Sequence, residues 1–201
     1  MLDARLRRLI DPPLDRLSGA LDGGRLTPNA ITLQGLAVGL LVPVALAYEA
    51  YGLALALILV NRLLDGLDGA LARRQGPTDL GGFLDIVCDF IFYAAVPFGF
   101  ALADPAANGV AAAFLIFSFV GTGSSFLAFA VMAAKRGFST EVRGRKSIYY
   151  LGGLTEGTET ILAFALACLF PGHFPLIAVV FGALCWLTTA TRIALAWQTL
   201  R

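Results

Sequence analysis

Six long apolar stretches constrain this chain more than any other feature of its sequence. Loops rich in glycine, proline or charge separate them, and the stretches lie near residues 30–49, 51–72, 80–103, 108–134, 148–170 and 174–197. A helix of about 20 apolar residues is long enough to cross the hydrocarbon core of a bilayer. The sequence therefore predicts an all-α integral membrane bundle of six transmembrane helices.

The composition excludes several other classes of protein. Apolar residues make up 58% of the 201 residues and charged residues 14%, which is unlike a water-facing globule. Six spans leave no room for a separate soluble domain of ordinary size. The formal net charge of +1 provides no basic surface for nucleic acid. We therefore expect any chemistry to lie within or beside the bilayer.

The basic residues predict which way the spans run. Outside the stretches they fall before the first, between the second and third, between the fourth and fifth, and at Arg201, whereas the three alternate loops contain no lysine or arginine. Cytoplasmic loops of membrane proteins carry the excess of basic residues. Both termini are thus expected on the cytoplasmic side, together with the loops that follow the second and fourth spans.

The segment before the first span has its own pattern. Leucines recur at helical spacing among arginines and aspartates, with Pro12 and Pro13 placed like a helix start. We interpret residues 1–26 as an amphipathic interfacial helix with its linker, and residues 27–201 as a transmembrane catalytic domain. A frayed cytosolic tail is the alternative.

Four aspartates interrupt the otherwise apolar second and third stretches. Asp65 and Asp68 are three residues apart, and Asp85 and Asp89 are four apart, so each pair shares one helix face. A charge at the bilayer centre costs about 2.5–3.5 kcal/mol on an insertion scale. Because a short loop joins the two helices into a hairpin, we expect the pairs to meet at one depth near the cytoplasmic side.

Four converging carboxylates need a counter-charge, because they cannot all ionise side by side. Carboxylate oxygens without histidine or cysteine favour hard divalent ions such as Mg²⁺, Mn²⁺ or Ca²⁺, and four carboxylates could hold two ions around a diphosphate. Glycines such as Gly69 and Gly81 leave room for a ligand or a neighbouring helix. Arg73, at the membrane face, is placed to meet a phosphate.

Other interpretations of these aspartates remain open. Arg62, Arg73 and water could satisfy them in a purely structural arrangement. Buried acids also suit an ion-conducting or proton-relay path, although no ladder of polar residues continues to the outer face. A non-enzymatic divalent-cation carrier or binding protein is the alternative function.

The run from Asp65 to Asp89 resembles the signature of the CDP-alcohol phosphotransferase family, DxxDGxxAR followed after a short gap by GxxxDxxxD. Every fixed position of the pattern is present, namely Asp65, Asp68, Gly69, Ala72, Arg73, Gly81, Asp85 and Asp89. The segment from Thr27 to Thr32 is similar to the family's start of the first span.

This resemblance implies transfer of a substituted phosphate from a CDP-linked donor, CDP-diacylglycerol in most small bacterial-type members, to an alcohol acceptor with release of CMP. It implies a phospholipid-synthesis enzyme that uses two divalent cations, Mg²⁺ or Mn²⁺. Asp65, Asp68 and Asp85 look like metal ligands. Asp89 would both touch a metal and take the proton from the acceptor hydroxyl.

The resemblance also suggests the nucleotide contacts and the assembly. Gly69 and Arg73 would line the cytidine diphosphate, and Asn29, Thr32 and Thr78 would do so by a looser analogy. A homodimer in a bacterial inner membrane is expected on the same ground.

The sequence leaves the acceptor open. Five basic residues between the fourth and fifth spans suit a phosphorylated acceptor, yet topology alone also demands them. Glu156 and Glu159 are predicted two to three turns into the fifth span, at a depth like that of the aspartates. They could bind the acceptor, pair with Arg192 on the sixth span, or extend the metal shell.

Overall fold

The computed structural model describes residues 12–20, 26–137 and 155–201, and over these residues the chain is all-α, with no strand. After a helix at 12–20, the elements are α2 (Pro28–Gly39), α3 (Val42–Ala47), α4 (Tyr51–Gln75), α5 (Asp79–Ala103), α6 (Pro105–Lys135), α7 (Gly157–Leu169), the 3₁₀ turn η1 (Pro171–His173) and α8 (Phe174–Thr199). The predicted helical class is therefore confirmed.

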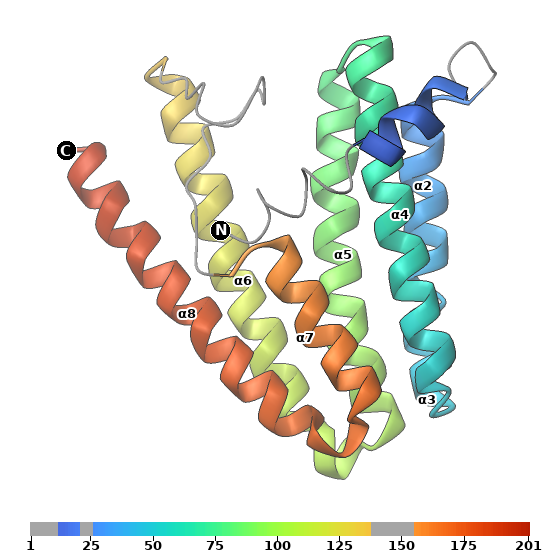
Figure 1. The fold of residues 1–201 in the computed structure, drawn as a ribbon. Helices are drawn as coiled ribbons and strands as arrows, with labels where there is room; N and C mark the ends of the chain where they lie inside the picture. The colour runs from blue at the N-terminus through green and yellow to red at the C-terminus, as the bar shows by residue number, and fades with distance from the viewer. Residues whose placement is uncertain (1–11, 21–25, 138–154) are drawn as a thin grey trace.

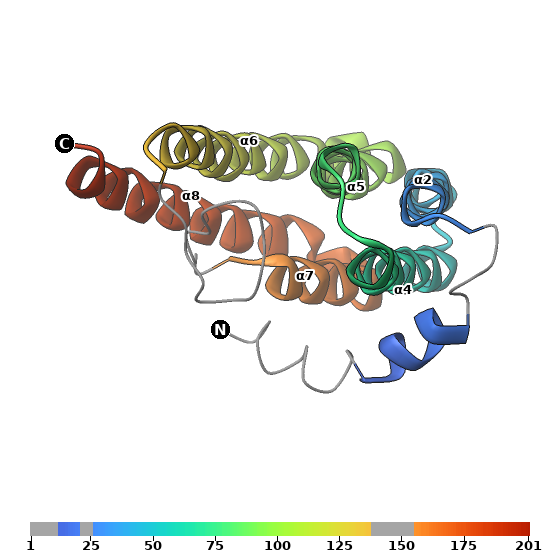
Figure 2. The same cartoon turned by 90° about the horizontal axis from the view of Figure 1, so that it is seen from above.

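The long helices form two rows (Figures 1 and 2). Seen from above, α6, α5 and α2 make one row, and α8, α7 and α4 make the other. Contacts run within and between the rows, since α6 packs on α5 and α8, α2 on α4 and α5, and α4 on α7. The C-terminal ends of α4, α6 and α8 lie at the same end of the bundle in Figure 1. The last turn of α4 carries Arg73 and Arg74, and that of α6 carries Lys135.

Among the described residues, four helical segments are long and apolar enough to cross a membrane: Pro28–Ala47, Asp79–Ala103, Pro105–Lys135 and Pro171–Thr199. The 25 residues of α4 would also reach across a bilayer, but the charged residues Arg62, Asp65 and Asp68 interrupt its apolar sequence. The described helix α7 has only 13 residues. The described residues thus contain four candidate membrane spans, as expected of an integral membrane protein.

Side-chain caps explain where three of these helices begin. Thr27, Thr78 and Asp104 precede α2, α5 and α6, and each accepts a hydrogen bond from a backbone amide in the first turn of its helix. Such caps satisfy amides that have no partner inside the helix. They fix the N-termini of α2 and α5, which border the aspartate region.

The first span is broken near its middle. The helix α2 ends at Gly39, and α3 begins with Pro43 in its first turn. The break lies against Gly99 of α5, where an added Cβ would be 2.6 Å from the Cα of Pro43. The bend and the glycine together allow the two backbones to approach closely.

Aromatic side chains fill the core between the rows. Phe92, Phe100, Phe164 and Phe174 are almost fully buried, and the rings of Phe100 and Phe174 stack with centroids 4.2 Å apart. Large apolar side chains such as Val110 and Leu176 are instead exposed on the outside. An apolar exterior of this kind is what a helical bundle presents to lipid.

The predicted N-terminal helix is described only at residues 12–20, and residues 1–11 and 21–25 lie outside the described structure. Leu14 is buried against α4, where it sits over Gly66, whereas Leu17 is 45% exposed. The side chain of Arg74 donates to Ser18 Oγ and to the carbonyl oxygen of Asp15. The segment is therefore docked on the end of α4, and its amphipathic interfacial character remains a prediction.

The fifth span differs from the prediction. It was expected as one helix over 148–170, but Thr155 and Glu156 are not helical and α7 begins at Gly157. Residues 148–154 lie outside the described structure. Glu156 and Glu159 therefore lie at the start of a helix and not several turns inside one. There they accept hydrogen bonds from backbone amides of the helix start.

Candidate active site

The aspartate region is built by the hairpin of α4 and α5. The helix α4 ends before Gly76, whose φ of 99° is a conformation that residues with a side chain rarely adopt. Two residues later Thr78 caps α5 by accepting from the amide of Gly81 at 3.0 Å. This short connection returns the chain antiparallel to α4 and sets Asp85 opposite Asp65 and Asp68.

Three of the four predicted metal ligands converge. Asp65, Asp68 and Asp85 each offer a carboxylate oxygen within 4.8 Å of the other two, the one such group of potential ligands among the described residues. Asp68 is buried, Asp65 is half-buried and Asp85 is exposed. Oxygen-only ligands suit a hard divalent ion, so the donor set fits Mg²⁺ or Mn²⁺.

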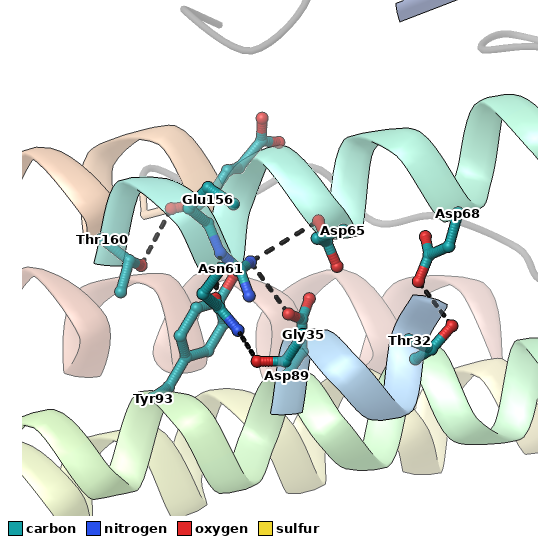
Figure 3. Close-up of polar contacts among 10 residues, drawn as sticks. Thr32, Gly35, Asn61, Asp65, Asp68, Asp89, Tyr93, Glu156 and Thr160 are labelled. Carbon is teal, nitrogen blue, oxygen red and sulfur yellow. Dashed lines mark hydrogen bonds and ion pairs between the residues drawn. The ribbon is translucent and has the colours of Figure 1, made fainter. Parts of the chain in front are cut away.

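Asp89, the fourth ligand predicted, lies beside this group and not within it. Its Oδ1 is 2.9 Å from Nη1 of Arg62, which is also 3.6 Å from Oδ2 of Asp65. Figure 3 shows Asp68 at one end of the constellation and Asp89 toward the other, with Asp65 between them. All three line one small pocket, together with Thr32, Gly35, Leu36, Asn61, Arg62 and Cys88.

Thr32 reaches the carboxylates from α2. Its Oγ1 is 2.5 Å from Oδ2 of Asp68 (Figure 3). The same Oγ1 is 3.1 Å from the carbonyl oxygen of Pro28. Both Thr32 and Asp68 are buried. The first span thus contributes a direct polar contact to the predicted metal cluster.

The other residues predicted to contact the nucleotide lie around the ends of α2, α4 and α5. A Cβ added to Gly81 would be 3.1 Å from Oδ1 of Asn29 and 3.1 Å from Oγ1 of Thr78, so these three meet closely. At Gly69 an added Cβ would be 3.7 Å from Nη1 of Arg73.

The guanidinium of Arg73 is engaged outside the pocket. Its Nη2 lies 3.6 Å from Oδ1 of Asp15, and both side chains are about half exposed. An exposed pair of this kind contributes little to stability. The interaction therefore leaves Arg73 able to turn toward a ligand.

Sequence reasoning did not assign a site role to Asn61, Arg62 or Tyr93. Arg62 donates from Nε to Oδ1 of Asn61 at 2.8 Å and from Nη1 to the hydroxyl oxygen of Tyr93 at 3.4 Å. Arg62 had been considered only as a structural partner of the aspartates. Its spacing three residues before Asp65 was the available signal.

Glu156 and Glu159 form a reciprocal capping box at the start of α7. The backbone amide of Glu156 donates to Oε2 of Glu159 at 3.1 Å, and the Glu156 side chain accepts from the backbone amide of Glu159. This arrangement satisfies helix-end amides. The helix start also borders the site, because a Cβ on Gly157 would be 3.4 Å from the hydroxyl oxygen of Tyr93.

Arg192 is buried on α8 and contacts α6. Its Nη1 donates to the carbonyl oxygen of Thr122 at 2.9 Å, and its guanidinium lies 5.6 Å from the ring centroid of Phe126. Both interactions tie α8 to α6.

Comparison with known proteins identifies the fold and the family. The family model described as CDP-alcohol phosphatidyltransferase matches residues 25–197, which is most of the chain. The chain belongs to the CDP-alcohol phosphatidyltransferase family. It is therefore a phospholipid-synthesis enzyme that transfers a substituted phosphate group, which decides against the cation carrier as its function.

Two curated relatives of this phosphatidyltransferase match nearly its whole length. The inner membrane protein YnjF of Escherichia coli is 56% identical over 100% of this chain and 98% of its own. The archaetidylinositol phosphate synthase of Methanothermobacter thermautotrophicus is 29% identical over 98% of this chain and 92% of its own.

Solved structures of the phosphatidylinositol phosphate synthase of Mycobacterium tuberculosis share the fold. One, with CDP-DAG bound, has a TM-score of 0.67 at 18% identity over 92% of this chain and 93% of that chain. Another, in complex with manganese and citrate, has a TM-score of 0.68 at 20% identity over 92% and 88%. At these identities the likeness concerns the fold alone.

Proposed function

We propose that this phosphatidyltransferase moves a phosphatidyl group from CDP-diacylglycerol to an alcohol and releases CMP, with two divalent cations, Mg²⁺ or Mn²⁺, at the aspartates. One observation carries the proposal: carboxylates of Asp65, Asp68 and Asp85 from two helices meet within 4.8 Å, beside Asp89. The M. tuberculosis relative has been crystallised with CDP-DAG and with manganese, which supports the choice of donor and ion.

Each site residue has a role in this proposal. Asp65, Asp68, Asp85 and Asp89 hold the cations, which when bound would neutralise the diphosphate and favour departure of CMP. Thr32 holds the carboxylate of Asp68 through the 2.5 Å contact between their oxygens.

Asp89 is the proposed general base. It accepts the proton of the acceptor hydroxyl as the acceptor oxygen forms a bond to the phosphorus that carries diacylglycerol. The bond from that phosphorus to the oxygen of CMP breaks in the same displacement. The side chain of Asp89 is only partly buried and lines the pocket, so a small hydroxyl group has access to it.

The cytidine diphosphate is proposed to lie at the adjoining helix ends. Asn29, Thr78 and Gly69 line it there, and Arg73 exchanges its weak pair with Asp15 for a phosphate oxygen. The N-termini of α2 and α5 point their amides toward this region, a favourable setting for an anion.

The membrane arrangement completes the proposal. Together with the four candidate spans, α4 and the segment containing α7 give a total of six spans. Both termini and the active site face the cytoplasm of a bacterial inner membrane. The relative YnjF is named as an inner membrane protein. The N-terminal 26 residues serve as an interfacial segment, and the enzyme works as a homodimer. Reporter fusions at each loop test the orientation, and crosslinking in native membranes tests the dimer.

CMP release tests the reaction. Purified protein is incubated with CDP-diacylglycerol, Mg²⁺ or Mn²⁺, and a panel of alcohols: glycerol 3-phosphate, inositol phosphate, serine, choline and phosphatidylglycerol. We expect CMP release with one acceptor, and Asp89→Asn should abolish it while the melting temperature stays within a few degrees. Full activity of Asp89→Asn, or no CMP with any acceptor, would contradict the proposal.

A further inference from the structure

Arg62 directly contacts two of the carboxylates of the pocket. It lies on α4 one helical turn before Asp65, and its side chain is only 18% exposed. One nitrogen, Nη1, is 2.9 Å from Oδ1 of Asp89 and 3.6 Å from Oδ2 of Asp65. A single guanidinium therefore contacts carboxylates from both helices of the hairpin.

The guanidinium is held from several sides. Its Nε donates to Asn61, whose own amide nitrogen donates to the carbonyl oxygen of Gly35 on α2 at 2.8 Å. The Arg62 guanidinium carbon lies 4.7 Å from the ring centroid of Phe92 and 5.5 Å from that of Tyr93, within the range of cation–π attraction. Its position is thus set by the fold and not by the aspartates alone.

The position of Arg62 distinguishes Asp89 from the other three carboxylates. Asp65, Asp68 and Asp85 form a group whose oxygens lie within 4.8 Å of one another, and Asp89 is outside that group but in contact with Arg62. A cation could enter the group of three without disturbing Asp89. The guanidinium contacts Asp89 through its Oδ1, so a second cation that binds this oxygen competes with Arg62.

We propose that Arg62 is a positioning residue that acts as a built-in counter-ion for Asp89, so that two divalent cations bind in order. The first binds to Asp65, Asp68 and Asp85, and the second competes with Arg62 for Asp89. This inference rests on the proposed function, because it assumes two cations at these aspartates. Arg62 is not among the fixed positions of the signature motif, so the property belongs to this chain's own sequence.

Coulomb's law predicts the direction and size of the effect of Arg62 on cation affinity. A unit positive charge a few ångströms from a divalent cation opposes its binding, and the effect is roughly tenfold in affinity even in a water-like dielectric. Neutralising Arg62 should therefore tighten the second site. If Arg62 instead only supported the fold, its removal would loosen both sites or leave them unchanged.

Manganese binding to the purified protein tests this directly, without any substrate. Electron paramagnetic resonance counts free Mn²⁺ and gives the stoichiometry and affinity of each site. We expect two unequal sites in the wild type, and in Arg62→Gln a second site about tenfold tighter. Arg74→Gln is the matched control, because Arg74 lies on the same helix but bonds Ser18 and the carbonyl of Asp15. It should bind Mn²⁺ like the wild type.

A double-mutant cycle tests whether the effect acts through Asp89. Asp89→Asn should weaken the second site, and adding Arg62→Gln to it should tighten Mn²⁺ binding by clearly less than it does when the Asp89 carboxylate is present. An equal gain with and without the Asp89 carboxylate would overturn the proposal.

Thermal unfolding provides a second readout. Without metal, Arg62→Met should melt earlier than the wild type, because it removes a positive charge from beside two carboxylates while keeping much of the apolar stem. Saturating Mn²⁺ should reverse most of that loss, since the second ion then supplies the charge. An equal loss of melting temperature with and without Mn²⁺ would show a structural role only.

The outcomes separate this inference from the proposed function. If Arg62→Gln does not fold without metal, Arg62→Met, which keeps much of the apolar stem, is measured instead, and its second site should likewise bind Mn²⁺ about tenfold more tightly than that of the wild type. If the wild type releases CMP and binds two Mn²⁺ but Arg62 variants leave both affinities unchanged, the inference alone fails. If the wild type binds no Mn²⁺, both this inference and the metal dependence in the proposed function fail.

Discussion

Thr32 on α2 and Asp68 on α4 are in direct contact, with 2.5 Å between Oγ1 and Oδ2, and both side chains are buried. The contact links two helices through residues that are 36 positions apart in the sequence. It places a hydroxyl beside the most buried of the three converging carboxylates.

Thr32→Val should impair cation use without unfolding the protein. The substitution keeps the shape of the side chain and removes a buried hydrogen bond to a carboxylate, which is worth about 1.5–3 kcal/mol. We expect the Mn²⁺ concentration for half-maximal CMP release to rise roughly tenfold or more. Thr191→Val is the control, because the Thr191 hydroxyl bonds only a carbonyl of its own helix. Equal behaviour of the two variants would argue against the role of Thr32.

Gly81→Ala should lower CMP release, whereas Gly82→Ala should not. A Cβ at Gly81 would press on Asn29 and Thr78 at 3.1 Å, and a Cβ at Gly82 would meet nothing within 4 Å. We expect at least a severalfold loss of kcat/KM for CDP-diacylglycerol in the first variant. In the second, alanine improves helix propensity by up to about 1 kcal/mol. Steady-state kinetics on both proteins provides the comparison.

Gly99→Ala should destabilise the bundle. Its Cβ would be 2.6 Å from the backbone of Pro43 at the break of the first span, and overpacking of this kind costs about 1–3 kcal/mol. Gly109→Ala is a matched change on α6 with open space around it. Thermal unfolding in detergent should show a lower melting temperature for Gly99→Ala alone. A wild-type melting temperature for that variant would show that the two helices separate easily.

The capping box indicates that Glu159 serves to stabilise the start of α7. A glutamine oxygen can accept the same hydrogen bond from the amide of Glu156, so Glu159→Gln should preserve both stability and acceptor KM. Glu159→Ala should lose about 1 kcal/mol of stability. If Glu159→Gln raises the KM for the acceptor while the melting temperature stays unchanged, the charge of Glu159 serves the acceptor and not the cap.

The sequence predicted much of the local arrangement of the site. Spacings of three and four residues place Asp65 with Asp68, and Asp85 with Asp89, on common helix faces, and the short loop at Gly76 brings the faces together. The partners across the bundle could not be predicted in the same way. That Arg62 pairs with Asp89 depends on how α4 and α5 are rotated against each other, which periodicity within one helix does not specify.

The helix breaks were missed for a related reason. Apolar runs predict that a segment lies in the membrane, but they do not predict where it bends. The interruption after Gly39 and the start of α7 at Gly157 are set by contacts with other helices and by capping at Glu156. Hydropathy reports neither the contacts between helices nor the capping of their ends.

The charged interior of α4 has a consequence for how the protein reaches its membrane. Arg62, Asp65 and Asp68 would each oppose partitioning of an isolated α4 into hydrocarbon, yet in the folded protein their groups face α2 and α5. We expect α4 to leave the translocon together with its neighbours, with α5 entering as the second arm of a hairpin. The ion pair between Arg62 and Asp89 would then form during biogenesis, before any lipid substrate arrives.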